Sequence, residues 1–403
     1  MKEILYVWNY REWGGAQIYF MSLIKKVKKI YKVTALLPKN SDTKLLQYLS
    51  DIDASVLFLP PVARVSEAWG FLARLKRKVA YFRSEDLMVR EILGRDNLSA
   101  QIVHADLGFW QSLTPLIRLC RKTHVFTTVH TGLPLLKGLR GLRWKIKGKI
   151  ISRFPTFHLM ASNADARESL RPYITKQKFE QVEIAYSGFD PNEIERVGNN
   201  QRTAANLRDK WRLPKDVPAL ITVGQFIERK GCWILLESLQ RLKSDGHRFT
   251  FLWLATTTTP ADVAERINDH ELGESFRVLG GHEIGETRDD LLSLMNGADI
   301  FVLASLQEGL PIALVEAMAL GLPCIATNIN AIPEAIEDDE NGILIPPNDS
   351  ARLSEAMADL LTHPEKRKRF GAAAKHTAYE RFDERNTAER TLKLYEAVWK
   401  TST

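Results

Sequence analysis

The stretch Glu308-Gly309-Leu310-Pro311-Ile312-Ala313-Leu314-Val315-Glu316 decides how this chain is interpreted. It follows the apolar run Ile300–Ser305, which predicts a buried strand. It leads into a helical pattern that Pro311 opens and that Gly321 and Pro323 close. A strand that runs directly into a helix start leaves backbone N–H groups free for an anion. The stretch therefore predicts a strand–turn–helix unit with an anion site.

Two carboxylates frame this turn, because Glu308 precedes the predicted helix and Glu316 lies inside it. At about 1.5 Å of rise per helical residue, their backbones are on the order of 10–12 Å apart. That separation is similar to the reach of a folded nucleotide diphosphate sugar. One carboxylate would take sugar hydroxyls and the other ribose hydroxyls, with phosphate on the amides between them. The alternative is a buried strand–helix unit with two ordinary surface glutamates.

Bulk composition describes an ordinary globular protein of two domains. The chain has 403 residues, 45% of them hydrophobic, and no apolar run approaches the 18 residues of a membrane span. The first residues, Met1–Val7, read as a strand and are too short in their apolar part for a signal peptide. The three cysteines, Cys120, Cys232 and Cys324, are far apart in apolar surroundings, which predicts buried thiols in a reducing compartment.

Charge is distributed unevenly along the chain. Residues 1–200 hold 32 Lys and Arg against 18 Asp and Glu, whereas residues 201–403 hold 24 against 31. The most basic segment, Lys137–Arg153, has seven cations and no anion, with leucines and isoleucines at helical spacing. A basic amphipathic stretch of this kind suits an anionic lipid surface. The alternatives are a solvated face or an arm for a soluble anionic acceptor. No nucleic-acid motif accompanies the charge.

Short apolar runs alternate with helical patterns in both halves, which predicts parallel sheets covered on both faces. The predicted strands are Ile4–Trp8, Val33–Leu37, Val56–Leu59, Ile102–Ala105, Phe126–Val129, His158–Ala161, Glu183–Tyr186, Ala219–Val223, Thr250–Leu254, Ser275–Leu279, Ile300–Ala304, Pro323–Thr327 and Gly342–Ile345. The predicted helices include Ala16–Lys29, Leu113–Lys122, Cys232–Leu242, Asp289–Met295, Pro311–Leu320, Ser350–Leu361 and Arg381–Lys400. The fold class is therefore α/β, with two doubly wound, Rossmann-like domains and ligands at the carboxyl ends of the strands. The expected domains are residues 1–190, residues 191–380, and a final helix, residues 381–403, that crosses back to the first domain. The polar, turn-rich segment 188–218 is the expected junction.

Three weaker motifs follow predicted strands. Gly14 and Gly15 open the first helix and let a substrate approach the backbone. His130 ends a strand of the first domain, where it can donate to a sugar hydroxyl or a phosphate. Lys230 lies at a strand-to-helix turn of the second domain, where its charge suits phosphate. The bland alternatives are a loop glycine pair, a structural histidine and a solvated basic loop.

These residues together resemble the retaining glycosyltransferases of family 4 (group 1), which have the GT-B fold. The resemblance covers most of the chain and is strongest from Leu220 to about Pro347. Its specific part is EGLPIALVEAMALGLPCIAT, with Glu308 and Glu316 eight positions apart, followed by IPEAI and NGILIPPND and preceded by VGQFIERKG. The GGAQ and TVH segments of the first half occur in the expected order.

The resemblance implies a role for each motif residue. Glu316 would bind the ribose, while Glu308 and the backbone of Gly309, Leu310, Pro311 and Ile312 would hold the donor sugar. Lys230 would neutralise the diphosphate, and Gly15 would lie against the phosphates or the acceptor. His130 would lie by the transferring sugar, and Leu279 to His282 would border the base. We therefore predict Lys230, Glu308 and His130 as catalytic residues and the others as donor-binding residues.

This sequence departs from the family pattern at three places. Gln225 stands where the family usually has arginine, so one diphosphate cation is missing, and Arg229 is the expected substitute. Residues 255–260 replace a glycine-rich turn, and Asn330-Ala331 replaces a glycine pair. Each change alters the rim of the donor pocket and leaves the reaction class as it is.

The predicted activity is transfer of a hexose from a nucleotide diphosphate sugar to an acceptor hydroxyl with retention. It needs no metal or cofactor, and the acceptor is a saccharide or a lipid-linked saccharide. The setting would be bacterial lipopolysaccharide or polysaccharide assembly, with a cytoplasmic protein peripheral to the inner face of the plasma membrane. The alternatives are a nucleotide-sugar epimerase or hydrolase of the same fold, and a non-catalytic surface-binding protein. The donor base, the sugar and the acceptor stay open.

Overall fold

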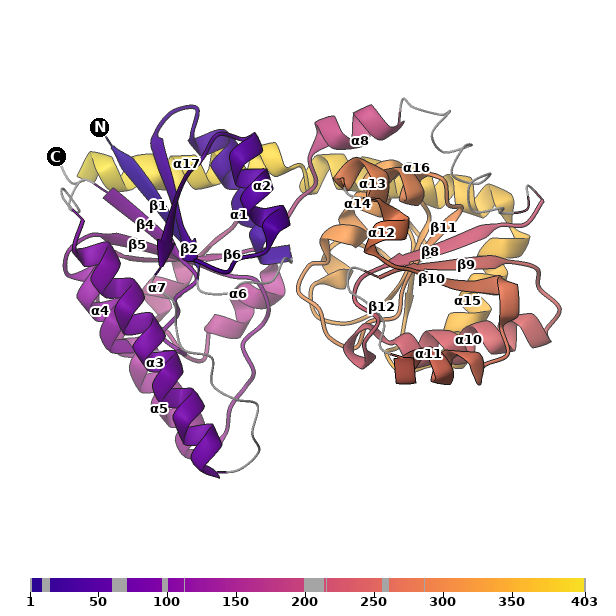
Figure 1. Cartoon of the computed structure of the whole chain (residues 1–403), viewed down its shortest axis with the longest axis horizontal. Helices are drawn as coiled ribbons and strands as arrows, with labels where there is room; N and C mark the ends of the chain where they lie inside the picture. Colours follow the sequence, from indigo (N-terminus) through magenta and orange to yellow (C-terminus); the bar gives the residue numbers. More distant parts are fainter. Residues whose placement is uncertain are drawn as a thin grey trace. The chain divides into compact units, whose positions relative to one another are not determined.

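The computed structural model describes residues 2–8, 15–59, 71–95, 101–111, 113–198, 214, 216–255, 261–285 and 287–401. The chain divides into two compact units (Figure 1). The first holds Met1–Ala185 and Arg385–Thr403, and the second holds Tyr186–Glu384, against predicted boundaries after residues 190 and 380. No helix in the described ranges is long and apolar enough to cross a membrane.

The first unit is built on a parallel sheet of seven strands in the order β3-β2-β1-β4-β5-β6-β7. Its strands are β1 (Glu3–Val7), β2 (Lys32–Pro38), β3 (Ser55–Leu59), β4 (Gln101–Ala105), β5 (His124–Val129), β6 (Phe157–Ala161) and β7 (Glu183–Ile184). Its helices are α1 (Gly15–Val27), α2 (Thr43–Asp51), α3 (Phe71–Leu93), α4 (Leu113–Cys120), α5 (Gly138–Ile151), α6 (Ala164–Leu170), α7 (Lys176–Glu180) and α17 (Glu384–Thr401).

Helices cover both faces of this sheet, as near-continuous apolar strands require. Residues of β1 alternate between the faces, so Ile4 and Tyr6 pack with α1, α2 and α17, whereas Leu5 and Val7 pack with α3 and α4. Figure 1 shows α3, α4 and α5 together on the side of the sheet away from α1 and α2. The final helix is therefore part of the first unit's core.

A buried polar network fastens α17 to this sheet. The Tyr395 hydroxyl lies 2.5 Å from His104 Nδ1 and 3.3 Å from the Tyr6 hydroxyl, and His104 Nε2 lies 2.8 Å from Thr128 Oγ1. His104 is fully buried, and burial lowers its pKa to about 3. The ring is therefore neutral at physiological pH, with each nitrogen partnered by a hydroxyl.

The second unit has a parallel sheet of six strands in the order β10-β9-β8-β11-β12-β13. Its strands are β8 (Ala219–Val223), β9 (Thr250–Leu254), β10 (Phe276–Leu279), β11 (Ile300–Leu303), β12 (Cys324–Thr327) and β13 (Ile343–Ile345). Its α-helices are α8 (Pro191–Gly198), α10 (Cys232–Ser244), α11 (Ala261–Asn268), α12 (Gly281–Ile284), α13 (Arg288–Asn296), α14 (Ile312–Leu320), α15 (Ser350–Thr362) and α16 (Pro364–Arg381). Short 3-10 turns occupy η2 (Glu228–Lys230), η3 (Gly273–Ser275) and η4 (Ile332–Glu334).

Two apolar clusters sandwich this second sheet. Ala219 and Ile221 of β8 face the cluster that contains α8, α13, α14 and α16, and Leu220 faces the cluster of α10 and α15. The buried faces of α10 and α15, thirteen residues each, supply most of the helical residues of the second cluster. The carboxyl ends of β8 and β11 lie side by side, because the two strands are hydrogen-bonded neighbours.

Every strand predicted from the sequence is present, displaced by at most a residue or two. The predicted helices are also present, with the final one beginning at Glu384 instead of Arg381. Eight helices of the described residues were not predicted: α2, α3, α6, α7, α8, α11, α12 and α16. Of these, α8 lies inside the segment read as a turn-rich junction, and α16 carries a strongly mixed charge pattern over its 18 residues. In α8, Pro191 begins the helix and Ile194 and Val197 supply a narrow buried stripe.

Candidate functional site

The second unit brings two loops together at the carboxyl ends of β8 and β11. Gly231, between η2 and α10, has φ +70, and a Cβ there would lie 1.9 Å from the carbonyl oxygen of Ala304. A side chain is therefore excluded by contact as well as by backbone conformation. This close approach, with a hydrogen bond from the Leu306 N–H to the Arg229 carbonyl at 2.8 Å, fixes one loop against the other.

Lys230 and Glu308, which the sequence assigned separately to the diphosphate and to the donor sugar, meet at that contact. Lys230 Nζ lies 2.5 Å from Glu308 Oε1, and the side chains are 16% and 8% exposed. Arg229 Nη1 lies 3.8 Å from Glu308 Oε2 and donates to the Gln307 carbonyl at 3.0 Å. Two cations therefore share one carboxylate, which leaves positive charge at the mouth of the two loops.

Three polar residues orient Glu308. The Ser305 hydroxyl donates to Glu308 Oε1 at 2.7 Å, and the Thr327 hydroxyl donates to the Ser305 carbonyl at 2.6 Å. The Glu308 backbone N–H donates to Asn330 Oδ1 at 3.2 Å. Asn330 has φ +45, in the left-handed region where asparagine is tolerated. Asn330 thus adopts the left-handed backbone conformation for which a glycine is usual at this position. Its side chain also contacts Glu308, which was not predicted from the sequence.

The helix that follows, α14, begins one residue later than predicted. Pro311 is its N-cap, with φ −70 and ψ 120, so Ile312 is the first helical residue. The proline therefore loses no helical hydrogen bond, and the free N–H groups start at Ile312. Gly309 is half-buried, while Leu310, Pro311 and Ile312 are buried under the loop. The helix start lies four residues after Glu308, and its free N–H groups can receive an anion.

Glu316 lies one helical turn further on, and an arginine that sequence reasoning missed contacts it. The Arg288 guanidinium donates to Glu316 Oε1 through Nη2 and lies 2.9 Å from Glu193 Oε2 through Nε. Glu316 is 3% exposed and Glu193 is 12% exposed. Burial raises the pKa of the Glu316 carboxyl, and the charge of Arg288 acts in the opposite direction. Burial also opposes the charge on Arg288, but the two carboxylates outweigh it and raise its pKa.

The rest of the predicted donor rim is only partly described. Gln225 is half-buried after β8, and Leu279 is buried at the end of β10. His282 lies in α12, but its side chain is outside the described residues, as are residues 256–260 of the loop that departs from the family pattern. Gly280, before α12, donates its N–H to Glu283 Oε2 at 2.7 Å.

The predicted residues of the first unit lie at the carboxyl edge of its own sheet. Gly15 begins α1, whereas Gly14 is outside the described residues. His130 directly follows β5, its ring packs edge-on against Tyr19 with 4.9 Å between centroids, and its Nε2 is buried without a hydrogen bond among the described residues. Burial lowers the pKa of His130 to about 4, so the ring is neutral at pH 7. A buried nitrogen without a partner is suited to a ligand hydroxyl.

The three cysteines are free and buried, which confirms the prediction of buried thiols. Burial raises the pKa of Cys120 to about 12 and that of Cys232 to about 11, so both thiols are protonated at neutral pH. In the described part of the chain, no three His, Cys, Asp or Glu residues are arranged to share a metal ion.

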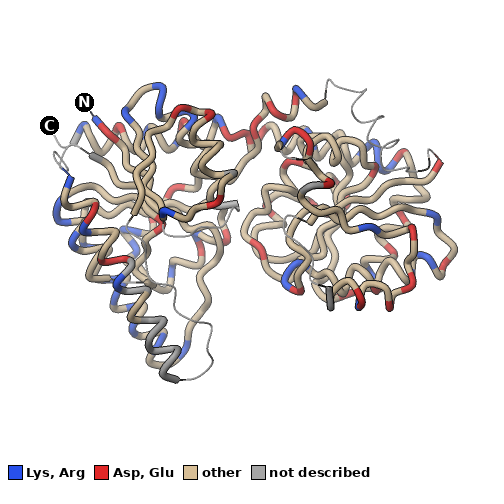
Figure 2. The backbone as a smooth tube through the Cα atoms, in the orientation of Figure 1, with Lys and Arg blue, Asp and Glu red and all other residues tan. Residues whose placement is uncertain are grey.

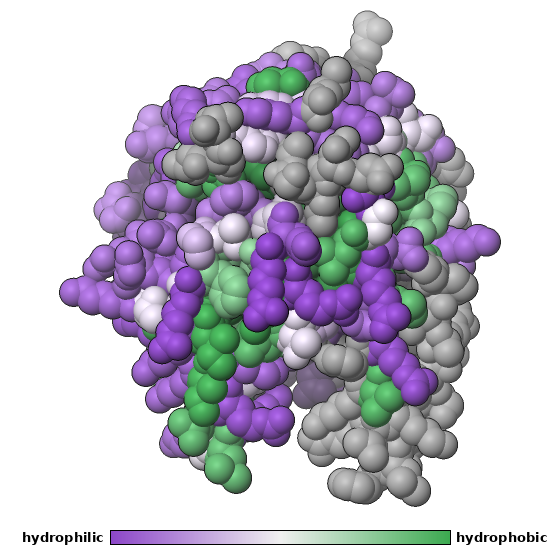
Figure 3. All heavy atoms as spheres, turned by 90° about the vertical axis from the view of Figure 1, so that its left-hand side faces the viewer, coloured by the Kyte–Doolittle hydropathy of each residue, from purple (hydrophilic) through white to green (hydrophobic). Residues whose placement is uncertain are grey.

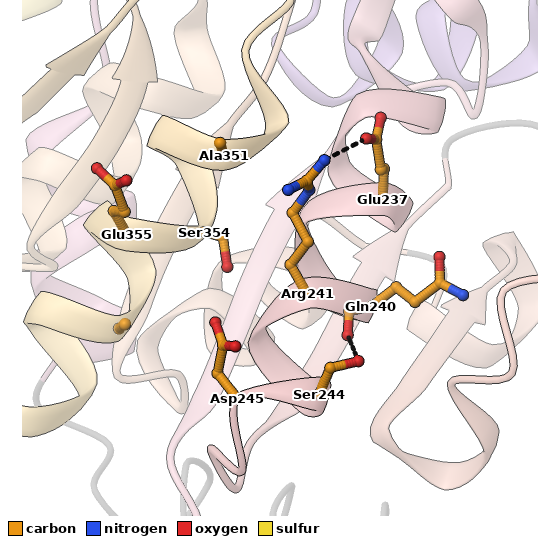
Figure 4. A pocket seen from close by; sticks show the side chains of 9 residues that line it. Glu237, Gln240, Arg241, Ser244, Asp245, Ala351, Ser354 and Glu355 are labelled. Carbon is orange, nitrogen blue, oxygen red and sulfur yellow. Dashed lines mark hydrogen bonds and ion pairs between the residues drawn. The ribbon is translucent and has the colours of Figure 1, made fainter.

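A hollow of about 540 Å³ lies between α10 and α15, away from the predicted site residues (Figure 4). None of the predicted site residues lines it. Its one cation, Arg241, is paired with Glu237 at 3.1 Å, and the Ser244 hydroxyl donates to the carbonyl of Gln240 at 2.9 Å. The polar groups drawn with dashed lines are thus satisfied within their own helix, and the hollow is not part of the Lys230 site.

Comparison with known proteins places the second unit in a family. Residues 204–377 match the model of the glycosyl transferases group 1. The chain is 28% identical over 193 residues to the lipopolysaccharide core biosynthesis glycosyltransferase LpsE of Rhizobium meliloti, covering 48% of this chain and 54% of that protein. It is 32% identical over 148 residues to the putative colanic acid biosynthesis glycosyltransferase WcaL of Escherichia coli, covering 34% and 35%. The chain thus spans about half or less of these relatives.

The fold likeness extends over the whole chain. The crystal structure of HepE from Anabaena in complex with UDP aligns with a TM-score of 0.76 over 98% of this chain and 100% of that one, at 16% identity. This confirms the predicted GT-B class of two Rossmann-like units, and the family model confirms the predicted family. Residues 204–377 therefore form a segment of the glycosyl transferases group 1 type, within a chain that has the GT-B fold.

Proposed function

We propose that this protein transfers a hexose from a nucleotide diphosphate sugar to an acceptor hydroxyl, with retention at the anomeric carbon. The contact of Lys230 with Glu308 beneath the start of α14 carries the proposal. It places two cations, the part-buried Lys230 and the more exposed Arg229, beside a carboxylate suited to sugar hydroxyls. The free backbone N–H groups of α14 begin four residues further along the chain. The complex of the fold neighbour HepE with UDP makes a uridine diphosphate sugar the first donor to test.

In this mechanism the protein supplies charge and position, and no protein nucleophile is needed. Lys230, Arg229 and the α14 amides stabilise the negative charge that develops on the β-phosphate as the bond from the sugar to the phosphate breaks. The acceptor oxygen bonds to the same face of the anomeric carbon, and its proton passes to the departing phosphate. Glu308, held by Ser305 and Asn330, fixes the sugar hydroxyls.

Donor binding provides the first test. We expect one of UDP, GDP and ADP to raise the melting temperature, because a ligand that binds only the folded state stabilises it by mass action. Lys230→Ala should abolish that rise. Lys243→Ala is the matched control, since within the described residues its ammonium binds the carbonyls of Glu271 and Leu272 alone, at the far end of α10. Donor consumption that is equally fast without any acceptor would replace transfer by epimerisation or hydrolysis.

We also propose that the first unit rests on an anionic membrane through Lys137–Arg153, where it meets a lipid-linked saccharide. In α5, Gly141, Gly148 and Ile151 are buried against the unit. At about 100° per residue, Leu139 and Ile146 point roughly opposite to them. They and two neighbours are exposed: Leu135 by 72%, Leu139 by 81%, Leu142 by 54% and Ile146 by 50%.

Cations flank this outward apolar stripe on both sides. Arg143 and Lys147 lie along one edge, and Lys145 and Lys149 along the other. Figure 2 shows Lys and Arg recurring along α3, α4 and α5, and Figure 3 shows an apolar stripe between hydrophilic residues low on the first unit. An apolar stripe with cationic borders fits acyl chains below anionic headgroups. Together with the free, buried cysteines, this stripe supports a cytoplasmic enzyme at the inner face of a bacterial membrane, where it builds lipopolysaccharide or polysaccharide.

Vesicle flotation tests the membrane proposal. The protein should bind phosphatidylglycerol vesicles and not phosphatidylcholine vesicles, and 0.5 M salt should release it. The double variant Leu139→Gln, Ile146→Gln should weaken binding at unchanged melting temperature, because both side chains are exposed. Ile30→Gln, at a position 58% exposed elsewhere in the first unit, is the control. Equal binding by the double variant and the wild type would overturn the proposal.

A further inference from the structure

Arg288 links two carboxylates on different helices, and one of them is Glu316. The guanidinium comes from the first residue of α13, directly after the N-cap Thr287. Its Nη2 donates to Glu316 Oε1 on α14, and its Nε lies 2.9 Å from Glu193 Oε2 on α8. The arginine side chain is only 21% exposed, so all three charged groups are largely removed from water.

Glu316 is 3% exposed in an apolar helix, and burial without a charged partner would disfavour its ionised form. A neutral carboxyl is a poor acceptor for two hydroxyls, whereas an ionised one accepts at both oxygens. Arg288 engages Oε1 alone, and among the described residues Oε2 receives no hydrogen bond. The pair therefore keeps an ionised, oriented carboxylate with acceptor capacity to spare.

Glu193 in turn holds the arginine. A guanidinium presents its donors in a rigid planar fork, so the bond from Nε to Glu193 fixes the direction in which Nη2 points. A neighbouring pair fastens the same two helices: Arg196 on α8 bonds to Asp289 on α13, at 2.6 Å and 2.7 Å. The pair of Arg196 and Asp289 is more exposed and does not touch Glu316. A variant that removes this pair therefore tests anchoring of the two helices without changing the orientation of the Glu316 carboxylate.

We propose that Arg288 is a positioning residue for nucleotide recognition, which holds the Glu316 carboxylate ionised and aimed at the ribose hydroxyls, with Glu193 as its support. The proposal rests on the proposed donor site, because it assigns Glu316 to the ribose. It makes discrimination between ribose and deoxyribose depend on a residue that does not itself belong to the EGLPIALVE stretch.

The test compares dissociation constants of UDP and dUDP by calorimetry, with GDP and dGDP or ADP and dADP if those bases bind instead. Wild-type protein should prefer the ribonucleotide by about 10- to 100-fold, the worth of one hydrogen bond to a charged acceptor. Arg288→Gln should reduce that preference to within about threefold. Arg196→Gln, which removes the neighbouring pair, should keep the full preference. A loss of packing alone would not change this ratio.

Two further variants keep the outcomes distinct. Arg288→Lys is used if Arg288→Gln fails to fold, because it keeps a buried positive charge. A lysine ammonium cannot reproduce the planar fork of a guanidinium, so the preference for the ribonucleotide should fall in this variant too. Glu316→Gln should abolish the preference. If Glu316→Gln does so and neither Arg288 variant does, the positioning role is wrong and the donor site stands. If Glu316→Gln leaves both affinities unchanged, the assignment of the donor site itself fails.

Discussion

Replacement of Lys230 by alanine tests the proposed donor site most directly. The change removes an ammonium that lies 2.5 Å from Glu308 Oε1, in a pair whose members are 16% and 8% exposed. Loss of one partner from a buried pair costs about 3–5 kcal/mol when the other charge stays uncompensated. Glu308 keeps the Ser305 hydroxyl at 2.7 Å and Arg229 at 3.8 Å. We therefore expect a loss of about 1–3 kcal/mol in the free energy of unfolding.

Activity should fall by more than stability explains. Loss of one group that stabilises the charge of a transition state typically lowers turnover by about 100- to 1,000-fold. The double variant Lys230→Ala, Glu308→Gln separates the two effects, because it leaves no uncompensated carboxylate. Its melting temperature should recover, at about 2 to 4 °C per kcal/mol for a unit of this size, while its turnover stays low.

The assay measures nucleoside diphosphate release under saturating donor, alongside thermal unfolding of each variant. Lys243→Ala serves again as the control and should change turnover by less than twofold. A folded Lys230→Ala protein with turnover within about threefold of the wild type would refute the role of this lysine in stabilising the leaving group. Recovered turnover in the double variant would show instead that the single change acts through misplaced charge on Glu308.

Three other outcomes follow from the structure. Gly231→Ala should unfold more easily and lose donor binding, since its Cβ would lie 1.9 Å from the Ala304 carbonyl oxygen; an unchanged melting temperature would contradict this close approach. Tyr395→Phe should lower the free energy of unfolding of the first unit by about 1–3 kcal/mol, because His104 Nδ1 loses its partner, and chemical denaturation would measure it. The third outcome concerns pH, because burial lowers the pKa of His104 and His158 to about 3 in the folded state. In the unfolded state each histidine has a pKa of about 6.5, so below that pH the unfolded state binds more protons than the folded state. Stability should therefore fall as the pH drops through that value, by about 1.4 kcal/mol per histidine at pH 5.5, and a flat profile of denaturation midpoint between pH 7.5 and 5.5 would contradict it.

Local patterns in the sequence identified most of the architecture. Runs such as Ala219–Val223 and Thr250–Leu254 became strands with the predicted bounds, because a strand buried on both faces must be apolar throughout. The helix α16 escaped prediction because eight of its 18 residues are charged and only Phe370, Gly371, Ala374 and Ala378 are buried. A helix packed through small residues leaves little periodic signal.

The donor side of the site was similarly visible in part. Lys230 and Glu308 were predicted to act together, since the carboxyl ends of neighbouring parallel strands meet at one edge. Their supports were not predicted: Ser305 and Asn330 look like ordinary loop residues until their hydrogen bonds to Glu308 are known. The one available signal for Asn330 was that it replaces a glycine, because asparagine is a residue that tolerates the left-handed backbone conformation.

The sequence by itself determined the two α/β units, the strand–turn–helix of Glu308 to Glu316, and the basic segment 137–153, because each is encoded by residues close together in the chain. Tertiary structure alone decided which distant charges meet. Arg288 reaches Glu193 across 95 positions and Glu316 across 28, and Tyr395 meets His104 across 291. Such pairs depend on which helices pack side by side. That packing follows from burial of apolar surface over a whole unit. Because the hydrophobic effect is non-directional, the local sequence does not specify which polar side chains will meet.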